Sequence, residues 1–141
     1  MRADERGEIT AFLLIIFFAL FAIGGLVIDG GMALAAKRRA MNEAQAAARA
    51  GASQINETEY RRNGSVVLDR NAAITAALNY LQDHTSHRAG AAADVPDNNT
   101  VEVTVKFTQP MTILGIGSIT SLSINGNGSA RTAHGVVSEG Q

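Results

Sequence analysis

Twenty consecutive residues near the start of the chain carry no charged side chain. They are residues 9–28, ITAFLLIIFFALFAIGGLVI, and Thr10 has the one polar side chain among them. A helix of about 20 apolar residues covers the ~30 Å hydrocarbon core of a bilayer. The rival interpretation is a removable signal peptide, whose apolar core usually has about 7–15 residues and is followed by a small-residue cleavage site. The longer run predicts a transmembrane helix.

The residues after the apolar run favour a continued helix. Ten of the 22 residues from Gly31 to Ala52 are Ala, and none is Pro. Because Ala has the highest helix propensity, we expect one helix from Ile9 to about Ile55. Its length at 1.5 Å per residue would be about 70 Å.

The charges beside the span leave its orientation open. Lys and Arg are more frequent on the C-terminal side, at Lys37, Arg38, Arg39 and Arg49, which favours that side as cytoplasmic. A short N-terminal tail followed by a long soluble part is, in contrast, the layout of a signal anchor that exports its C-terminus.

Small residues recur along one face of the predicted helix. Their steps are three or four residues, with a mean of about 3.6, the α-helical period. Small residues let helices approach closely in a membrane, so the stripe predicts a face that packs against copies of the chain or partner subunits. An Ala-rich composition can also produce such a stripe by chance. We call these residues the small-residue stripe: Ala19, Ala22, Gly25, Asp29, Ala33, Ala36, Ala40, Ala44, Ala47 and Gly51.

Asp29 is the charged member of the stripe. A carboxylate at the membrane boundary either reaches headgroup water or lies in a helix interface where it needs a partner. We expect Asp29 to reach water. If it is buried, a basic residue or a backbone N–H of a neighbouring subunit would have to satisfy it.

Residues 56–100 are expected to contain one further helix. The polar stretch around Asn63 and Gly64 favours a turn, in the region where the long helix should end. Apolar residues at three- and four-residue steps predict a second helix from Leu68 to Asp83. Residues 84–100 contain Gly90, Pro96 and paired Asn, and are expected to form a loop.

Strand patterns begin at Val101. Apolar and polar side chains alternate over residues 101–107, and Pro110 should end this strand. The next segment is punctuated by Gly115 and Gly117 and could form a loop folded onto the helix or a patch near the bilayer; its apolar residues are Met111, Ile113, Leu114 and Ile116. The dipeptide Asn125-Gly126 favours a type I′ turn between strands at 118–124 and 127–133.

These elements predict an α+β fold. It comprises a long N-terminal transmembrane helix continuing into an Ala-rich helix, a second helix, and a small antiparallel sheet of three or four strands.

Composition and motifs restrict the function classes. A net charge of -1 argues against a nucleic-acid partner, and an aromatic content of 5% argues against a small-molecule pocket. His84 and His87 are too few for a zinc site, and His134 lies apart from them at the end of the last predicted strand. His84 and His87 are better explained as complementing a helix dipole. The sequence contains no Walker loop, G-x-S-x-G or H-E-x-x-H. We therefore expect no enzyme activity, catalytic residue, metal or cofactor.

The N-terminal third of the chain resembles the TadE/TadG-like proteins of the Tad (Flp-type) pilus assembly system. The resemblance rests on residues 4–52, DERGEITAFLLIIFFALFAIGGLVIDGGMALAAKRRAMNEAQAAARAGA: a charged tail, one span, D-G-G and an Ala-rich helix. Two further likenesses are VEVTVKF at 101–107, followed by Pro110, and the terminal Ser/Asn/Gly-rich segment that ends near SARTAHG.

This resemblance implies a minor pilin or pseudopilin in the cell membrane that supports assembly of an adhesive pilus or secretion apparatus. It implies a cytoplasmic tail at 1–8, a transmembrane helix at 9–28, a helix continuation at 29–55 and an extracytoplasmic head at 56–141. Its partners would be the membrane and other pilin or Tad assembly subunits, including copies of itself. Prepilin cleavage would follow Gly7 and make Glu8 the first residue, with Phe12 where such pilins carry a glutamate. The alternative is a free-standing, single-span binding protein with an envelope-facing head.

Overall fold

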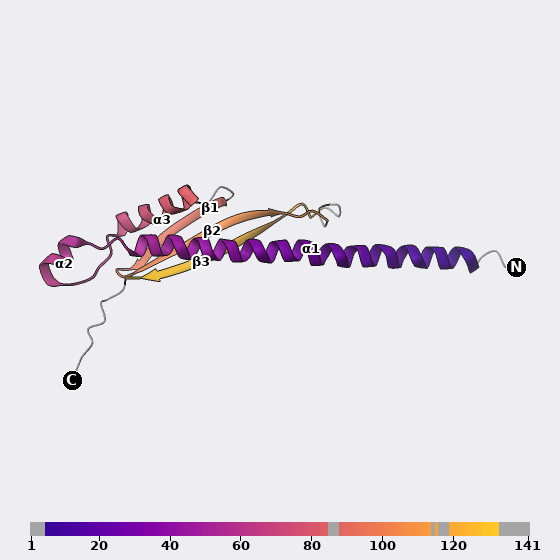
Figure 1. Ribbon diagram of the computed structural model, residues 1–141, viewed down its shortest axis with the longest axis horizontal. Coiled ribbons are helices and arrows are strands. Elements are labelled where there is room, and N and C mark those ends of the chain that lie inside the picture. The colour runs from indigo at the N-terminus through magenta and orange to yellow at the C-terminus, as the bar shows by residue number, and fades with distance from the viewer. Residues whose placement is uncertain (1–4, 85–87, 114, 116–118, 133–141) are drawn as a thin grey trace, which may run out of the picture. The chain divides into compact units, whose positions relative to one another are not determined.

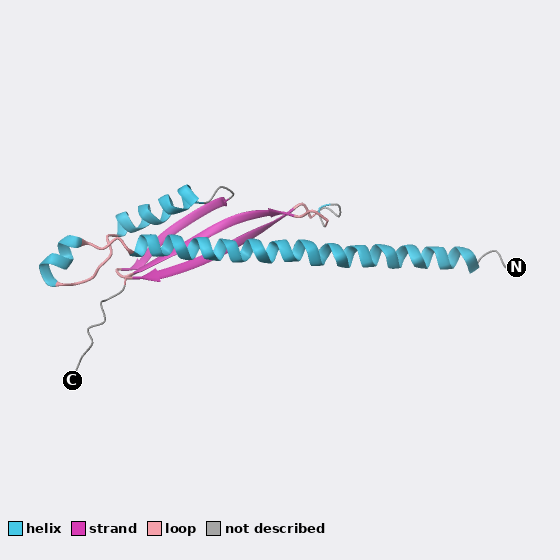
Figure 2. Ribbon diagram, in the orientation of Figure 1, coloured by secondary structure: helices cyan, strands magenta, loops and turns pink. Residues whose placement is uncertain are grey.

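The structure is a computed structural model that describes residues 5–84, 88–113, 115 and 119–132. The chain divides into two compact units, one of residues 1–35 and 109–122, the other of residues 36–108 and 123–141. The α+β prediction is confirmed: the described residues form three helices and a three-stranded antiparallel sheet in the order β1-β2-β3 (Figures 1 and 2). In chain order the elements are α1 (Glu5–Ala52), α2 (Glu57–Asn63), α3 (Arg70–His84), β1 (Arg88–Asp97), β2 (Thr100–Pro110) and β3 (Ser121–Arg131).

Helix α1 is continuous over 48 residues, about 72 Å at 1.5 Å per residue. It ends at Ala52, where the N–H of Gln54 donates to the carbonyl of Gly51 (3.0 Å). The Asn56 side chain then accepts hydrogen bonds from the backbone N–H groups of Thr58 and Glu59, and so caps a short helix.

The short helix α2 was not predicted from the sequence. Seven residues are too few to show a periodic apolar face, and none of them is buried. Acidic side chains in its first turn and basic ones in its last complement its dipole. Gly64, with φ 72°, ends α2 in the left-handed conformation, so the turn expected at Asn63-Gly64 is a helix C-cap.

The prediction of a loop at 84–100 was wrong, because most of this segment forms the edge strand β1. Its Ala residues have low strand propensity, but their small size allows α3 to pack against this strand. Ala91 pairs with Val105 and Ala93 with Val103 across an antiparallel ladder. The edge position and a register shift after Asp94 accommodate Pro96.

Strand β2 confirms the predicted alternation. Its apolar side chains are buried at Val101, Val103, Val105 and Phe107, and the strand ends at Pro110. The adjacent Glu102 and Lys106 are exposed. An added Cβ on Gly51 would lie 3.0 Å from Val101 Cγ1 and 3.3 Å from Ala77 Cβ, so α1, α3 and the apolar face of β2 meet there.

The prediction of a hairpin at Asn125-Gly126 was wrong, because both residues lie inside the single strand β3. An added Cβ on Gly126 would lie 2.5 Å from the carbonyl oxygen of Ala40. One on Gly128 would lie 2.6 Å from the Cα of Gln45. These glycines therefore permit the backbones of β3 and α1 to approach closely. Close approach of another backbone is a common reason for Gly within a strand.

Side chains of α1 also bind the edge of the sheet. The Lys37 ammonium donates to the backbone carbonyl of Asn125. The Gln45 amide donates to the carbonyl of Ser129 (2.8 Å). Lys37 and Gln45 are eight residues apart, so both face β3 from the same side of the helix.

Candidate membrane segment and helix-packing face

The N-terminal part of α1 has the properties of a membrane anchor. Among the described residues, α1 is the one helix long and apolar enough to cross a bilayer, and its apolar segment has a mean hydropathy of 3.0. Its large side chains are unpacked, with exposed fractions of 62% at Phe12, 68% at Ile15 and 69% at Val27. A helix segment that is apolar on all sides, and whose large side chains the described part of the chain leaves exposed, suits a lipid environment.

The small-residue stripe is covered by its own chain along most of its length. Ala19 and Ala22 are exposed and Ala33 is half-buried. The members of the stripe from Ala36 to Gly51 are buried in the unit that contains the sheet: Ala36, Ala40, Ala44, Ala47 and Gly51. Because Ala36 and Ala44 are inside this unit, enlarging either would perturb the head itself. Packing of the stripe against other subunits stays a prediction, and Ala19 and Ala22 are the members available for it.

The expectation that Asp29 reaches water was wrong. Its side chain is fully buried, and its two carboxylate oxygens accept the backbone N–H groups of Thr112 (3.1 Å) and Ile113 (3.0 Å). Gly25, one helical turn before Asp29, makes this possible, because an added Cβ there would clash with the Ile113 side chain. The groups that satisfy Asp29 thus belong to its own chain, and no neighbouring subunit is required.

Part of the apolar segment after β2 is therefore a loop folded onto the helix. Met111 and Ile113 lie in the unit that contains Gly25 and Asp29. Leu114, Ile116 and Gly117 lie outside the described residues. The sequence shows both the apolar segment and the acidic residue at the end of the span. It does not show that they are in contact, because Thr112 and Asp29 are 83 residues apart.

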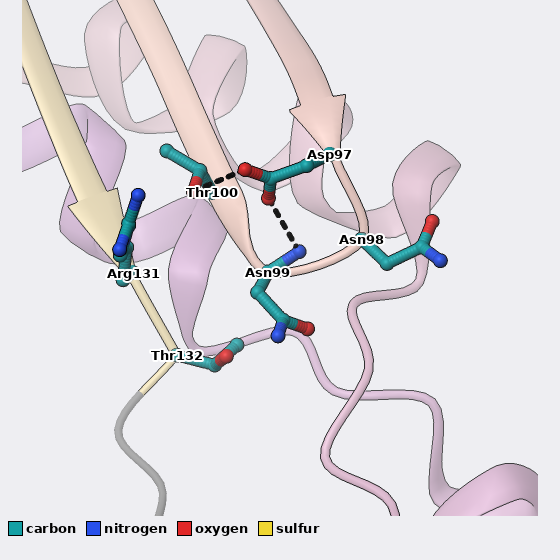
Figure 3. Close-up of a pocket in the computed structure, with 6 residues that line it drawn as sticks. All are labelled: Asp97, Asn98, Asn99, Thr100, Arg131 and Thr132. Atoms are coloured by element: carbon teal, nitrogen blue, oxygen red, sulfur yellow. Dashed lines mark hydrogen bonds between the residues drawn. The ribbon is translucent and has the colours of Figure 1, made fainter.

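A second polar feature is the turn between β1 and β2 (Figure 3). The Asp97 carboxylate accepts the backbone N–H of Asn99 (2.8 Å) and the hydroxyl of Thr100 (3.0 Å). These bonds, first the one from Asn99, lower the pKa of Asp97 below its ordinary value of 3.8. An open hollow of about 350 Å³ lies beside the turn, lined also by Asn98, Arg131 and Thr132. Because the carboxylate already binds its own turn, it acts there as a structural group.

The histidines do not converge in the described part of the chain. The Nδ1 atom of His84 lies 2.9 Å from the carbonyl oxygen of Tyr80, and the two rings stack with centroids 4.3 Å apart. His87 and His134 lie outside the described residues. Within those residues, no three His, Asp or Glu side chains gather in a group that could hold a metal ion.

Comparison with known families identifies the N-terminal helix. Residues 7–54 match the family model described as "Putative Flp pilus-assembly TadE/G-like". Over its N-terminal helix, the chain is similar to TadE/G-like proteins. No curated protein and no solved structure matches the chain. The resemblance drawn from the sequence is confirmed over this segment, and the match supports involvement in Tad pilus assembly.

The TadE/G-like segment includes both residues of the candidate cleavage site. Gly7 and Glu8 lie within the first turn of α1, which begins at Glu5, and Glu8 is exposed. An added Cβ on Gly7 would have no neighbouring atom within 4 Å. Cleavage after Gly7 stays a prediction.

Proposed function

We propose that this protein is a minor pilin or pseudopilin-like component of a Tad-type pilus assembly or secretion apparatus, acting through helix packing in the membrane. The observation that carries the proposal is the coincidence of the family match at 7–54 with an apolar helix segment whose large side chains are exposed. Partners in this proposal are the membrane and other pilin or Tad assembly subunits, including copies of the chain. The N-terminus is cytoplasmic and the head is extracytoplasmic.

The packing face of the proposal lies at Ala19 and Ala22. In lipid, apolar side chains gain little from meeting one another, so close van der Waals contact between small residues becomes a main source of helix association. Ala19 and Ala22 are exposed and three residues apart, so they form one small surface among large side chains. A partner helix could approach closely there.

A double substitution, Ala19→Leu with Ala22→Leu, tests this face. Steric overpacking costs about 1–3 kcal/mol, so association should weaken by about five- to 150-fold. We expect loss of co-purification with Tad subunits from mild detergent, and fewer assembled pili. Gly24→Leu is the matched control, because Gly24 lies two residues from Ala22, on the opposite side of α1, and an added Cβ there meets no atom within 4 Å.

The outcomes separate the two functional hypotheses. Co-purification that is unchanged in the double variant, or equally reduced in Gly24→Leu, would refute packing through Ala19 and Ala22. Normal pilus assembly by a strain that lacks the protein would instead favour the free-standing, membrane-anchored binding protein.

The absence of Cys from the sequence permits a direct test of orientation. Glu8→Cys and Glu57→Cys each introduce one thiol at an exposed position, on either side of the apolar segment. We expect a membrane-impermeant maleimide to label Glu57→Cys in spheroplasts and Glu8→Cys only after lysis. The reverse pattern would contradict the proposed topology.

A further inference from the structure

The loop within residues 109–122 has its backbone N–H groups satisfied at three consecutive positions. The N–H of Met111 donates to the carbonyl of Thr120 (3.0 Å). The next two, of Thr112 and Ile113, donate to the Asp29 carboxylate. Backbone donors without such acceptors are costly in lipid, because lipid has no water to replace the missing hydrogen bond. This stretch of loop therefore meets a requirement for contact with a bilayer.

The described residues of this loop are uncharged, and Ile113 lies beside the end of the apolar segment of α1. Ile113 packs at Gly25, which lies inside the apolar run, about one helical turn before Asp29. Ile119 and Leu122 have exposed fractions of 56% and 44%. No charged residue occurs between Lys106 and Arg131 in the sequence. Ile113 thus adds uncharged surface to the helix at the level where the apolar run ends.

We propose a second membrane contact where this loop joins β3, in which the side chains of Ile119 and Leu122 enter the interfacial layer of the bilayer beside α1. Interfacial segments bury their apolar face about 5–10 Å into the boundary between headgroups and acyl chains. Ile113, held at Gly25, lies about 6 Å along the helix from Asp29, which agrees with that depth. Asp29 sets the position of the loop, because its carboxylate holds two of the loop's N–H groups.

This inference goes beyond the proposed role in pilus assembly and does not depend on partner subunits. It requires that α1 span the bilayer and that the loop remain on the helix at Asp29. A vesicle that contains this protein alone is therefore a sufficient test system. Failure of subunit packing would leave the inference unaffected, and failure of lipid contact would leave the proposed packing face unaffected.

The chain contains no Trp, so one introduced Trp reports on one site. The experiment reconstitutes full-length Ile119→Trp in phosphatidylcholine vesicles and measures Trp emission. Quenching is compared between lipids brominated near the headgroup end of the acyl chain and aqueous iodide. Tyr60→Trp in α2 is the matched control, because Tyr60 is 50% exposed and lies beyond the end of α1.

We expect Ile119→Trp to emit at shorter wavelength than Tyr60→Trp, with at least twofold stronger quenching by brominated lipid and at least twofold weaker quenching by iodide. Equal iodide quenching at the two sites would overturn the inference. Protection of Ile119→Trp from both quenchers would also overturn it, because protein would then cover the loop. Leu122→Trp is the second reporter, and resistance of each variant to limited proteolysis verifies folding.

Discussion

Replacing Gly126 with Ala tests the contact between β3 and α1. The added Cβ would lie 2.5 Å from the Ala40 carbonyl oxygen and from the Met41 backbone nitrogen, whereas non-bonded heavy atoms prefer about 3.5–4.0 Å. Both neighbours are helix backbone, so β3 would have to retreat by about 1 Å. Such overpacking costs about 1–3 kcal/mol, and the less flexible unfolded chain returns about 0.4–1 kcal/mol. We expect a net loss of about 1.3 kcal/mol in the free energy of unfolding.

The matched control is Asn125→Thr, one residue earlier. Asn125 is exposed, and Lys37 binds its backbone carbonyl, which the substitution retains. In a strand, this change should alter stability by no more than about 0.5 kcal/mol. If Asn125-Gly126 formed a type I′ turn, Asn125 would need a positive φ, and the β-branched Thr would destabilise the protein.

The assay is urea unfolding of the full chain in mild detergent, followed by pulse proteolysis. A loss of about 1.3 kcal/mol, at a typical slope of about 1–3 kcal/mol per molar urea, lowers the midpoint by about 0.4–1.3 M. An unchanged midpoint for Gly126→Ala, or an equal decrease for Asn125→Thr, would refute the close approach of β3 to α1.

Two further predictions concern the same unit. Ala44→Leu places a large side chain at a fully buried position and should lower the free energy of unfolding by about 1–3 kcal/mol in the urea assay. The control is Ala35→Leu, at an exposed position of the same helix, which should change stability by less than about 0.5 kcal/mol. Equal effects of the two substitutions would contradict the burial of the stripe. Because the folded pKa of Asp97 lies below 3.8, its stabilisation is present above that pH and is lost as the pH falls through the folded value. As the pH falls through this range, the free energy of unfolding of Asp97→Asn should therefore decrease less than that of the unmodified chain. Identical pH profiles for the two proteins would exclude a contribution of the Asp97 carboxylate to stability.

The elements that could be predicted from the sequence are those specified by local patterns. Helix α1 follows from an apolar run joined to an Ala-rich segment, and β2 from strict alternation between Val101 and Phe107. Helix α3 extends over Arg70–His84, close to the predicted 68–83. In each case, the side chains within one segment contain enough periodicity to define the element.

The features that could not be predicted depend on contacts between distant segments. The Ala residues of β1 form a strand because α3 and β2 pack or pair with it, although their propensity opposes one. The local sequence predicts Gly126 in a turn, but Gly126 instead lies against the backbone of Ala40, 86 residues earlier. Asp29 was expected in water because the N–H groups that satisfy it lie 83 and 84 residues away. A local sequence such as Asn-Gly is compatible with a turn and with a close contact between backbones. Only the contacts in the fold show which of the two it forms.

The hydrogen bonds from Lys37 and Gln45 to β3 have a consequence for chains crowded in a membrane. An uncovered edge strand is a template on which another strand can add, and a high local concentration favours that reaction. Helix side chains occupy the carbonyls of Asn125 and Ser129, and Lys37 also places a positive charge at this edge. Sheet-to-sheet aggregation of the heads is thereby disfavoured at β3. Neighbouring chains can then accumulate at high density without their β3 edges joining.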